Sequence, residues 1–281
     1  MRLPDFIIIG AMKSGTSSLH GWLADQPECW LPALKEPNFF SDQPEWNKGL
    51  DWYAGLFAKA PTDKLTGEAS VRYTSPSWAP VAARRMAAVV PAVRLLYIVR
   101  HPVERIRSHY RHWLAHKWGD RSLARMMQEQ PAEFLGRSLY HKCLLPYIER
   151  FPREQICVVR FEDLIQEPYP AWGRVLDHLG LTDRPAPGRA YNVSQEIPHF
   201  PDWIIRLRRK GLLRPVKRWP APVRRTGRKF LARFLGGRRG SYEEIRARSM
   251  DPIPDEILEE LWEDIGRLEV WLGVEHPLWP R

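Results

Sequence analysis

A glycine-rich turn near the amino terminus has the composition of an anion-binding loop. Residues 10–16 (GAMKSGT) lie between the apolar run Phe6–Ile9 and a helix-like stretch. Successive backbone N–H groups in such a turn point at one place, and the following helix adds partial positive charge there. Lys13 precedes Gly15, whereas a nucleoside-triphosphate loop carries its lysine after the second glycine. The order of residues predicts a grip for a single 5′-phosphate, with an ordinary capped strand–turn–helix as the alternative.

A second anion site is predicted where another apolar run ends. Arg100 follows the run Arg94–Val99, Pro102 suits the first turn of a helix, and Ser108 lies two helical turns further on. A guanidinium binds phosphate in a bidentate manner, and a hydroxyl adds one more bond. A ligand with two separate phosphate groups would fill both sites, whereas ATP would not.

The stretch Leu34–Phe40 (LKEPNFF) places a cation and a carboxylate beside two aromatic side chains. On its own this stretch is expected to be a loop that enters a short helix, with both aromatic rings in the core. Glu68, further along the chain, is expected to support a lysine, bind an acceptor or cap a turn.

Alternating strands and helices are expected to position these side chains. The predicted strands are Phe6–Ile9, Arg94–Val99 and Ile156–Arg160, and the predicted helices are Thr16–Ala24, Val103–Trp118, Lys142–Arg150, Tyr169–Leu179 and Asp255–Leu272. Short β-branched runs alternating with helices predict an α/β fold with a parallel sheet covered on both faces. Ligands bind at the carboxyl ends of such strands.

Residues Pro4–Leu23 (PDFIIIGAMKSGTSSLHGWL) resemble the 5′-phosphosulfate loop of sulfotransferases that use 3′-phosphoadenosine 5′-phosphosulfate (PAPS). The similarity is closest to the heparan-sulfate-type and related bacterial branch, and it continues to about Ser194. The resemblance implies a three-layer fold like that of P-loop nucleoside kinases. It implies transfer of a sulfuryl group to a hydroxyl, or less favourably an amine, of a carbohydrate, lipid or small-molecule acceptor. Adenosine 3′,5′-bisphosphate is then released, and no metal is required.

The same resemblance assigns roles to individual residues. Lys13 matches the residue that neutralises the departing oxygen, and Glu36 matches the catalytic base. The donor-binding residues are expected to be Met12, Lys13, Ser14, Gly15, Thr16, Ser17, Arg100, Ser108 and Tyr140. Lys35, Glu68 and His112 are candidate acceptor-binding residues, and His112 is a candidate because its helix face could line the acceptor site. The chain departs from the family with His101 in place of a frequent Asp, Asn38 in place of a frequent His, and Ala69 in place of a lysine.

The positive charge of the chain is concentrated in one segment. Residues 206–239 hold 14 Lys or Arg and no Asp or Glu, and removing these charges from the total of +10 leaves −4 for the rest. This segment is expected to be a lid, or to contact nucleotide phosphates, an anionic acceptor or a membrane surface. No helix-turn-helix or zinc-finger pattern supports a specific nucleic-acid partner. We expect one domain over 1–281, with a catalytic core (1–200), a basic lid (201–242) and a C-terminal helix (243–281).

Cysteine and histidine usage sets further expectations. The three cysteines Cys29, Cys143 and Cys157 form no disulfide or metal framework, and no signal peptide or membrane-spanning run is visible, so we expect a bacterial cytoplasmic protein, with an optional contact to the inner face of a membrane. His109, His112 and His116 share a helix face without a zinc signature, so no metal is expected and a solvated or acceptor-lining face is preferred. His20 and His112 are reserve bases. An ATP-dependent kinase and a non-catalytic membrane or nucleic-acid binder remain the alternatives.

Overall fold

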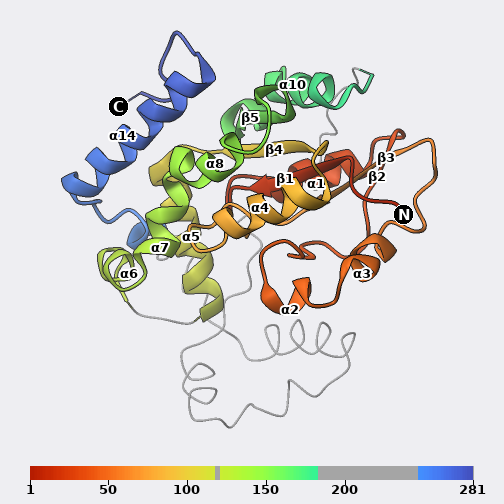
Figure 1. Ribbon diagram of the computed structural model, residues 1–281. Helices are drawn as coiled ribbons and strands as arrows, with labels where there is room; N and C mark the ends of the chain where they lie inside the picture. Colours follow the sequence, from red (N-terminus) through yellow and green to blue (C-terminus); the bar gives the residue numbers. More distant parts are fainter. Residues whose placement is uncertain (118–120, 183–245, 281) are drawn as a thin grey trace, which may run out of the picture.

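A parallel sheet runs through the centre of the molecule (Figure 1). The computed structural model describes residues 1–117, 121–182 and 246–280. In this part of the chain the sheet has five strands in the order β2-β3-β1-β4-β5, and every neighbouring pair is parallel. The strands are β1 (Phe6–Gly10), β2 (Cys29–Trp30), β3 (Leu65–Ala69), β4 (Arg94–Val99) and β5 (Ile156–Arg160).

Three of these strands confirm the prediction, while β2 and β3 were missed. Strand β3 has the sequence Leu-Thr-Gly-Glu-Ala, which contains a glycine and a carboxylate that disfavour strands. Its glycine is explained by packing, because a Cβ atom on Gly67 would lie 2.1 Å from the ring of Phe6 on β1. The residues of β3 therefore suit the packing of the sheet, although their own propensities disfavour a strand.

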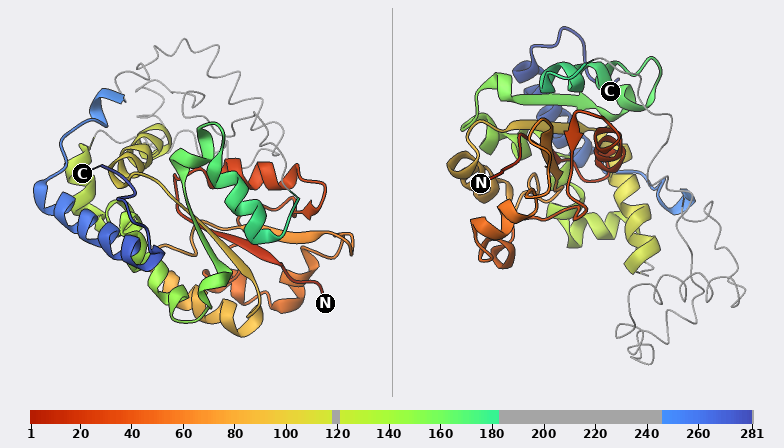
Figure 2. Two further views of the ribbon diagram at one scale, coloured as in Figure 1. Left: turned by 90° about the horizontal axis from the view of Figure 1, so that it is seen from above. Right: turned by 90° about the vertical axis from the view of Figure 1, so that its right-hand side faces the viewer.

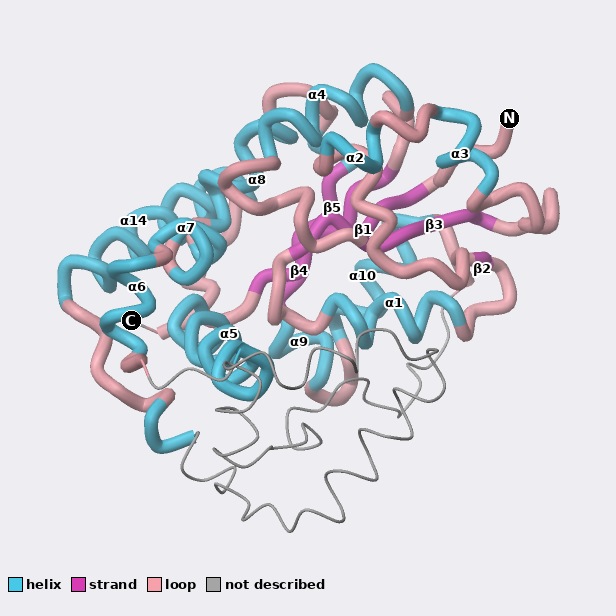
Figure 3. The backbone as a smooth tube through the Cα atoms, turned by 90° about the horizontal axis from the view of Figure 1, so that it is seen from below, coloured by secondary structure: helices cyan, strands magenta, loops and turns pink. Residues whose placement is uncertain are grey.

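Helices cover both faces of the sheet, as Figure 3 shows. One face packs against α1 (Thr16–Ala24), α9 (Phe161–Ile165) and α10 (Pro170–Leu179). The other face packs against α3 (Leu50–Gly55), α4 (Ala79–Val89), α8 (Tyr140–Ile148) and α14 (Asp255–Leu272). This arrangement confirms the three-layer α/β fold and the final helix that docks on the core.

Helix α14 lies along α8 (Figure 2), and a buried carboxylate joins them. Asp264 accepts hydrogen bonds from the backbone N–H groups of His141 (2.9 Å) and Lys142 (3.0 Å) at the start of α8. These N–H groups have no partner within their own helix, so the carboxylate caps α8. The C-terminal helix thus fixes the position of α8.

Helix α5 (Pro102–Lys117) begins directly after β4 and extends away from the sheet. It packs with α6 (Leu123–Glu129) and α7 (Pro131–Phe134) in a third apolar cluster. Pro102 occupies the first helical position, as predicted. The remaining short elements are α2 (Gln43–Trp46) and two 3₁₀ turns, η1 (Gly136–Ser138) and η2 (Arg153–Gln155).

The basic segment 206–239 and the stretch Asn192–Ser194 lie outside the described residues, so the expected lid and its membrane contact stay predictions. Within the described ranges, no helix combines the length and apolarity needed to cross a bilayer.

Candidate active site

The loop between β1 and α1 is a tight turn in which two residues have left-handed backbone conformations. Gly15 has φ +89°, and a Cβ atom there would lie 2.5 Å from the ring of Phe161 on α9. Lys13 also adopts a left-handed conformation, with φ +71°. The ring beneath Gly15 therefore supports the loop from below.

The loop presents several backbone N–H groups to one side. Within the stretch 11–17, the amides of residues 12, 13, 15, 16 and 17 donate to no described backbone carbonyl. Together with the start of α1 they suit the anion site that the sequence predicts. Ser14 differs from the expectation, because its amide donates to Ala11 O (3.2 Å) and its side chain is fully buried. Ser14 therefore shapes the loop in this structure.

The charges of three arginines act on Lys13 in this loop. The pKa of Lys13 is lowered to about 8, first by burial and then by Arg100, Arg111 and Arg105. A converging set of like charges opposes ionisation of the lysine unless an anion lies among them. The arrangement therefore fits a phosphate or sulfate group held beside Lys13.

Arg100 lies against the loop, as the resemblance implies. Its Nη1 donates to Lys13 O (3.4 Å), and its guanidinium carbon lies 4.7 Å from the centroid of the Phe161 ring. The structure places the Tyr140 side chain against Arg100, and its donor-binding role stays a prediction. Its fully buried hydroxyl donates to Arg100 O (2.7 Å) and accepts from Arg100 N (3.3 Å), so it holds the end of β4.

Ser108 lies on the face of α5 between two of the cations. Arg105 and Arg111 are three residues before and after it, and this spacing places all three on one side of the helix. Arg105 is fully buried and donates to Ser138 Oγ and Phe134 O. Neither arginine was predicted, although the spacing of each from Ser108 is a usable signal in the sequence.

The predicted structural stretch Arg160–Leu164 supports this second anion site. Glu162 Oε1 accepts from the backbone N–H of His101 (3.0 Å), and Oε2 accepts from Trp279 Nε1 (3.1 Å). His101 precedes the first residue of α5, so the carboxylate stabilises the start of that helix. The peptide group that joins Arg100 to His101 is therefore fixed at both its carbonyl oxygen and its N–H group.

Lys35, a predicted acceptor-binding residue, contacts the helix that follows the donor loop. Its Nζ donates to Ser17 Oγ on α1. Burial lowers the pKa of Lys35, and burial together with Lys35 lowers the pKa of His20 to about 4. The reserve base His20 is therefore neutral near pH 7 and adjoins a cation. Lys35 connects the donor loop to the neighbouring Glu36.

Glu36 lies at the carboxyl edge of the sheet beside β1. Its backbone N–H donates to Ala69 O (3.0 Å) at the end of β3, the strand that pairs with β1. Glu36 and Asn38 have φ +57° and +53°, conformations that cost roughly 1 kcal/mol or more each in residues other than glycine. Within the described chain, the half-buried Glu36 carboxylate has no hydrogen bond or ion pair. It is free to accept a proton, as the catalytic role requires.

Glu68 is not available to an acceptor, contrary to one of its predicted roles. It is 1 % exposed within β3, and three hydroxyl groups surround its carboxylate. Burial raises the pKa of Glu68 to about 7, while the hydroxyls of Tyr73, Ser70 and Tyr53 oppose the rise and Glu36 adds to it. The expected contact with Lys13 or Lys35 is replaced by this hydroxyl network.

The histidine face of α5 is less exposed than predicted. His109 is buried, its ring stacks on Phe134 with centroids 4.6 Å apart, and burial lowers its pKa. His112 is half-buried. In the described ranges, no group of three His, Cys, Asp or Glu could hold a metal ion.

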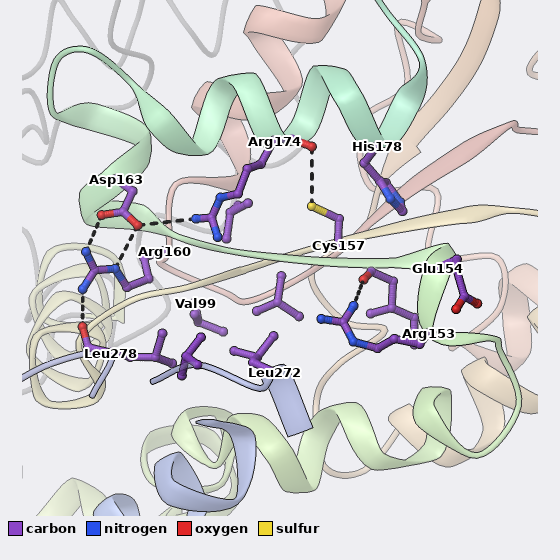
Figure 4. A pocket seen from close by; sticks show the side chains of 14 residues that line it. Val99, Arg153, Glu154, Cys157, Arg160, Asp163, Arg174, His178, Leu272 and Leu278 are labelled. Carbon is purple, nitrogen blue, oxygen red and sulfur yellow. Dashed lines mark hydrogen bonds and ion pairs between the residues drawn. The ribbon is translucent and has the colours of Figure 1, made fainter. Parts of the chain in front are cut away.

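A cavity of about 330 Å³ lies along β5 and α10, shown in Figure 4. Arg160 and Arg174 both contact Asp163 at one end, and Arg153 lies at the other. The lining contains neither Lys13 nor Glu36. This cavity is therefore separate from the candidate active site.

Residues 3–193 match the family model described as the sulfotransferase domain. The chain is 25 % identical over 285 residues to the bifunctional heparan sulfate N-deacetylase/N-sulfotransferase 2 of Bos taurus, covering 92 % of this chain and 31 % of that protein. It is 32 % identical over 190 residues to heparan sulfate glucosamine 3-O-sulfotransferase 3B1 of Mus musculus, covering 64 % and 47 %. The chain thus spans under half the length of these curated relatives.

A solved structure described as a sulfotransferase from Alicyclobacillus acidocaldarius has the same fold. It superimposes with a TM-score of 0.66 and 23 % identity, covering 100 % of both chains. A sulfotransferase domain from the curacin biosynthetic pathway gives a TM-score of 0.51 at 18 % identity, covering 66 % of this chain and 77 % of that one. These similarities support the fold predicted from the sequence.

Proposed function

This chain belongs to the sulfotransferase family, and from that premise we propose that it transfers the sulfuryl group of PAPS to a hydroxyl group. An amine is the second acceptor class. The observation that carries the proposal is the pairing of two features on neighbouring strands. A cluster of cations surrounds Lys13 after β1, and an unpaired carboxylate, Glu36, lies at the end of β3.

The donor would be held at two places. The free amides of the loop and the hydroxyls of Thr16 and Ser17 suit a 5′-phosphate, and Arg100 with Ser108 suits a 3′-phosphate. PAPS supplies an activated sulfuryl group on a phosphate leaving group. Lys13 neutralises charge that develops on the departing oxygen, and this preorganised charge lowers the barrier. Lys35, bonded to Ser17, adds a second cation on the side facing Glu36.

Glu36 is proposed to remove the acceptor proton as the new S–O bond forms. A base must lie within hydrogen-bond reach of that proton and have a free lone pair. The Glu36 carboxylate meets the second condition, because no described side chain occupies it. The bond to sulfur forms as the bond from sulfur to the phosphate oxygen breaks, and the proton passes to Glu36.

The acceptor is proposed to be a carbohydrate bearing hydroxyl and amino groups, with lipid and small-molecule alcohols as other candidates. The names of two similar proteins support this choice, since one is an N-sulfotransferase and the other a 3-O-sulfotransferase of heparan sulfate. Chemically desulfated heparan sulfate offers both groups. Mass spectrometry of the sulfated product would distinguish N- from O-transfer.

Two measurements test the proposal. Adenosine 3′,5′-bisphosphate is expected to raise the melting temperature more than ATP with Mg²⁺ does, because only the first has separate 5′ and 3′ phosphates. Radiolabelled PAPS is expected to label desulfated heparan sulfate or a metabolite panel. Preference for ATP with Mg²⁺, or transfer of phosphate in place of sulfate, would indicate a kinase.

The cellular location is also a proposal. The described cysteines Cys29, Cys143 and Cys157 are free thiols, which suits a reducing cytoplasm. Peripheral membrane contact through residues 206–239 rests on sequence alone. Fractionation of cells that express the chain with and without this segment would test both points.

A further inference from the structure

The buried carboxylate of Glu68 is bound by three hydroxyl groups. Tyr73 OH donates to Oε1 (2.7 Å), Tyr53 OH donates to the same oxygen (3.2 Å), and Ser70 Oγ donates to Oε2 (2.9 Å). In the described part of the chain, no cation pairs with this carboxylate. A buried carboxylate depends on such donors, so the network is a specific arrangement that the mechanism above does not use.

Two of the three hydroxyls also bind the backbone of the Glu36 loop. Ser70 Oγ accepts from Asn38 N (3.1 Å), and Tyr73 OH accepts from Phe40 N at the longer distance of 3.5 Å. A hydroxyl has one proton and two lone pairs. Because the carboxylate takes the proton, the lone pairs of Ser70 and Tyr73 are oriented toward the loop.

The third hydroxyl provides a contrast. The Tyr53 hydroxyl donates to Glu68, and its ring stacks on Phe39 with centroids 4.4 Å apart. Its hydroxyl accepts no described hydrogen bond from the loop backbone. Removing this hydroxyl therefore weakens the network without removing a bond to the loop.

The loop itself needs external support. Glu36 and Asn38 both have left-handed backbone conformations, and Asn38 Nδ2 donates to Glu36 O (2.9 Å). The hydrogen bond from the Asn38 backbone amide to Ser70 Oγ links this strained residue to the core. Loss of that bond would let Asn38 and then Glu36 return to commoner conformations.

We propose that Glu68 is a positioning residue, whose carboxylate orients the Ser70 and Tyr73 hydroxyls so that they hold the loop that carries Glu36. This inference rests on the proposed function, in which Glu36 is the base. The loop that carries Glu36 is then connected to β3 by two hydroxyl groups, each of which binds both the Glu68 carboxylate and the loop backbone.

The test compares variants that each remove one hydroxyl from the same carboxylate. Ser70→Ala removes a hydroxyl that reaches the loop, and Tyr53→Phe, the matched control, removes one that does not. Turnover of radiolabelled PAPS with desulfated heparan sulfate is measured at saturating donor and normalised to bound adenosine 3′,5′-bisphosphate. Ser70→Ala is expected to lower kcat about tenfold, equivalent to about 1.4 kcal/mol, and Tyr53→Phe less than about twofold.

Glu68→Gln provides a second variant of nearly unchanged shape. The amide oxygen can still accept from the tyrosines, but the NH₂ group faces Ser70 and leaves its proton without an acceptor. A loss in kcat similar to that of Ser70→Ala is expected. The double variant is expected to lose little more, because both changes break one pathway. Equal losses in Ser70→Ala and Tyr53→Phe, or unchanged kcat in both Ser70→Ala and Glu68→Gln, would overturn the positioning role.

Hydrogen exchange of the loop amides gives a readout independent of turnover. The amide of Asn38 is expected to exchange at least about tenfold faster in Ser70→Ala and Glu68→Gln than in Tyr53→Phe or the wild type, in proportion to the lost hydrogen bond. If the wild type transfers no sulfate, the proposed function fails while this measurement still decides the positioning role. If the wild type is active and the exchange rates are equal in all variants, the positioning role alone is rejected.

Discussion

Binding of adenosine 3′,5′-bisphosphate should take up a proton at alkaline pH, and Lys13 should be the group that binds it. In the free protein, burial and the neighbouring arginines lower the pKa of Lys13 to about 8. A phosphate dianion beside the ammonium should return this pKa to its usual value of 10.5 or above. The pKa change corresponds to about 3 kcal/mol of favourable interaction.

The number of protons follows from the same values. At pH 9 a lysine of pKa about 8 is roughly 90 % neutral, so binding should take up about 0.9 proton. At pH 7 the lysine is already charged, and the uptake should be about 0.1 proton. The dissociation constant should rise about tenfold for each pH unit above 8, since the neutral lysine must first bind a proton.

Isothermal titration calorimetry in two buffers of different ionisation enthalpy measures this uptake directly. Lys13→Met, which keeps an unbranched side chain without the charge, should bind the nucleotide with almost no uptake at pH 9. Uptake in the wild type below about 0.3 proton at pH 9, or equal uptake in Lys13→Met, would refute the placement of Lys13 among the cations at the phosphate site.

Three further predictions follow from the same geometry. Glu36→Gln should lower kcat at least about 100-fold with less than a twofold change in nucleotide affinity, and a collapse of affinity with normal kcat would exclude it as the base. Arg100→Ala should weaken adenosine 3′,5′-bisphosphate more than adenosine 5′-monophosphate, by about 2 kcal/mol in binding calorimetry, because one charge-assisted contact to the 3′-phosphate is lost. The pKa of Glu68 is raised in the folded state from 4.5 to about 7. The free energy of unfolding should therefore fall by roughly 3 kcal/mol as the pH rises from below 4.5 through 7, because the folded state holds this proton more tightly than the unfolded state does. Urea titrations at pH 5 and 8 should find that loss in the wild type but not in Glu68→Gln, and equal pH dependence would contradict the raised pKa.

Local pattern was sufficient for the elements around the donor loop. The helix predicted at Thr16–Ala24 and the final helix at Asp255–Leu272 have those bounds in the structure. Apolar runs and helical spacing are signals within a few residues, so one sequence is enough to find them. The order of loop, Arg100 and Ser108 likewise placed the two anion sites at neighbouring strand ends.

Strand β3 and the surroundings of its side chains could not be predicted from signals within a few residues. The Gly67 and Glu68 pair opposes a strand locally, and it is stable there because β1 packs against the glycine and hydroxyls from distant segments bind the carboxylate. The same distance in sequence explains why the burial and the hydrogen-bond partners of Tyr140 and Glu68 were not predicted. Both are residue types that bind ligands when exposed, and only the packing of α8 and α3 decides that they are buried.

The sequence by itself determined which chemical groups the protein carries and the strand ends at which they stand, because local backbone preferences and order along the chain are written in neighbouring residues. The tertiary structure decided how those groups behave. The pKa of Lys13 is lowered first by burial and then by the charges of three arginines. The loop that carries Glu36 is bonded to the core through Ser70. Burial and charge proximity are properties of space between distant segments, so they exist only once the chain has folded.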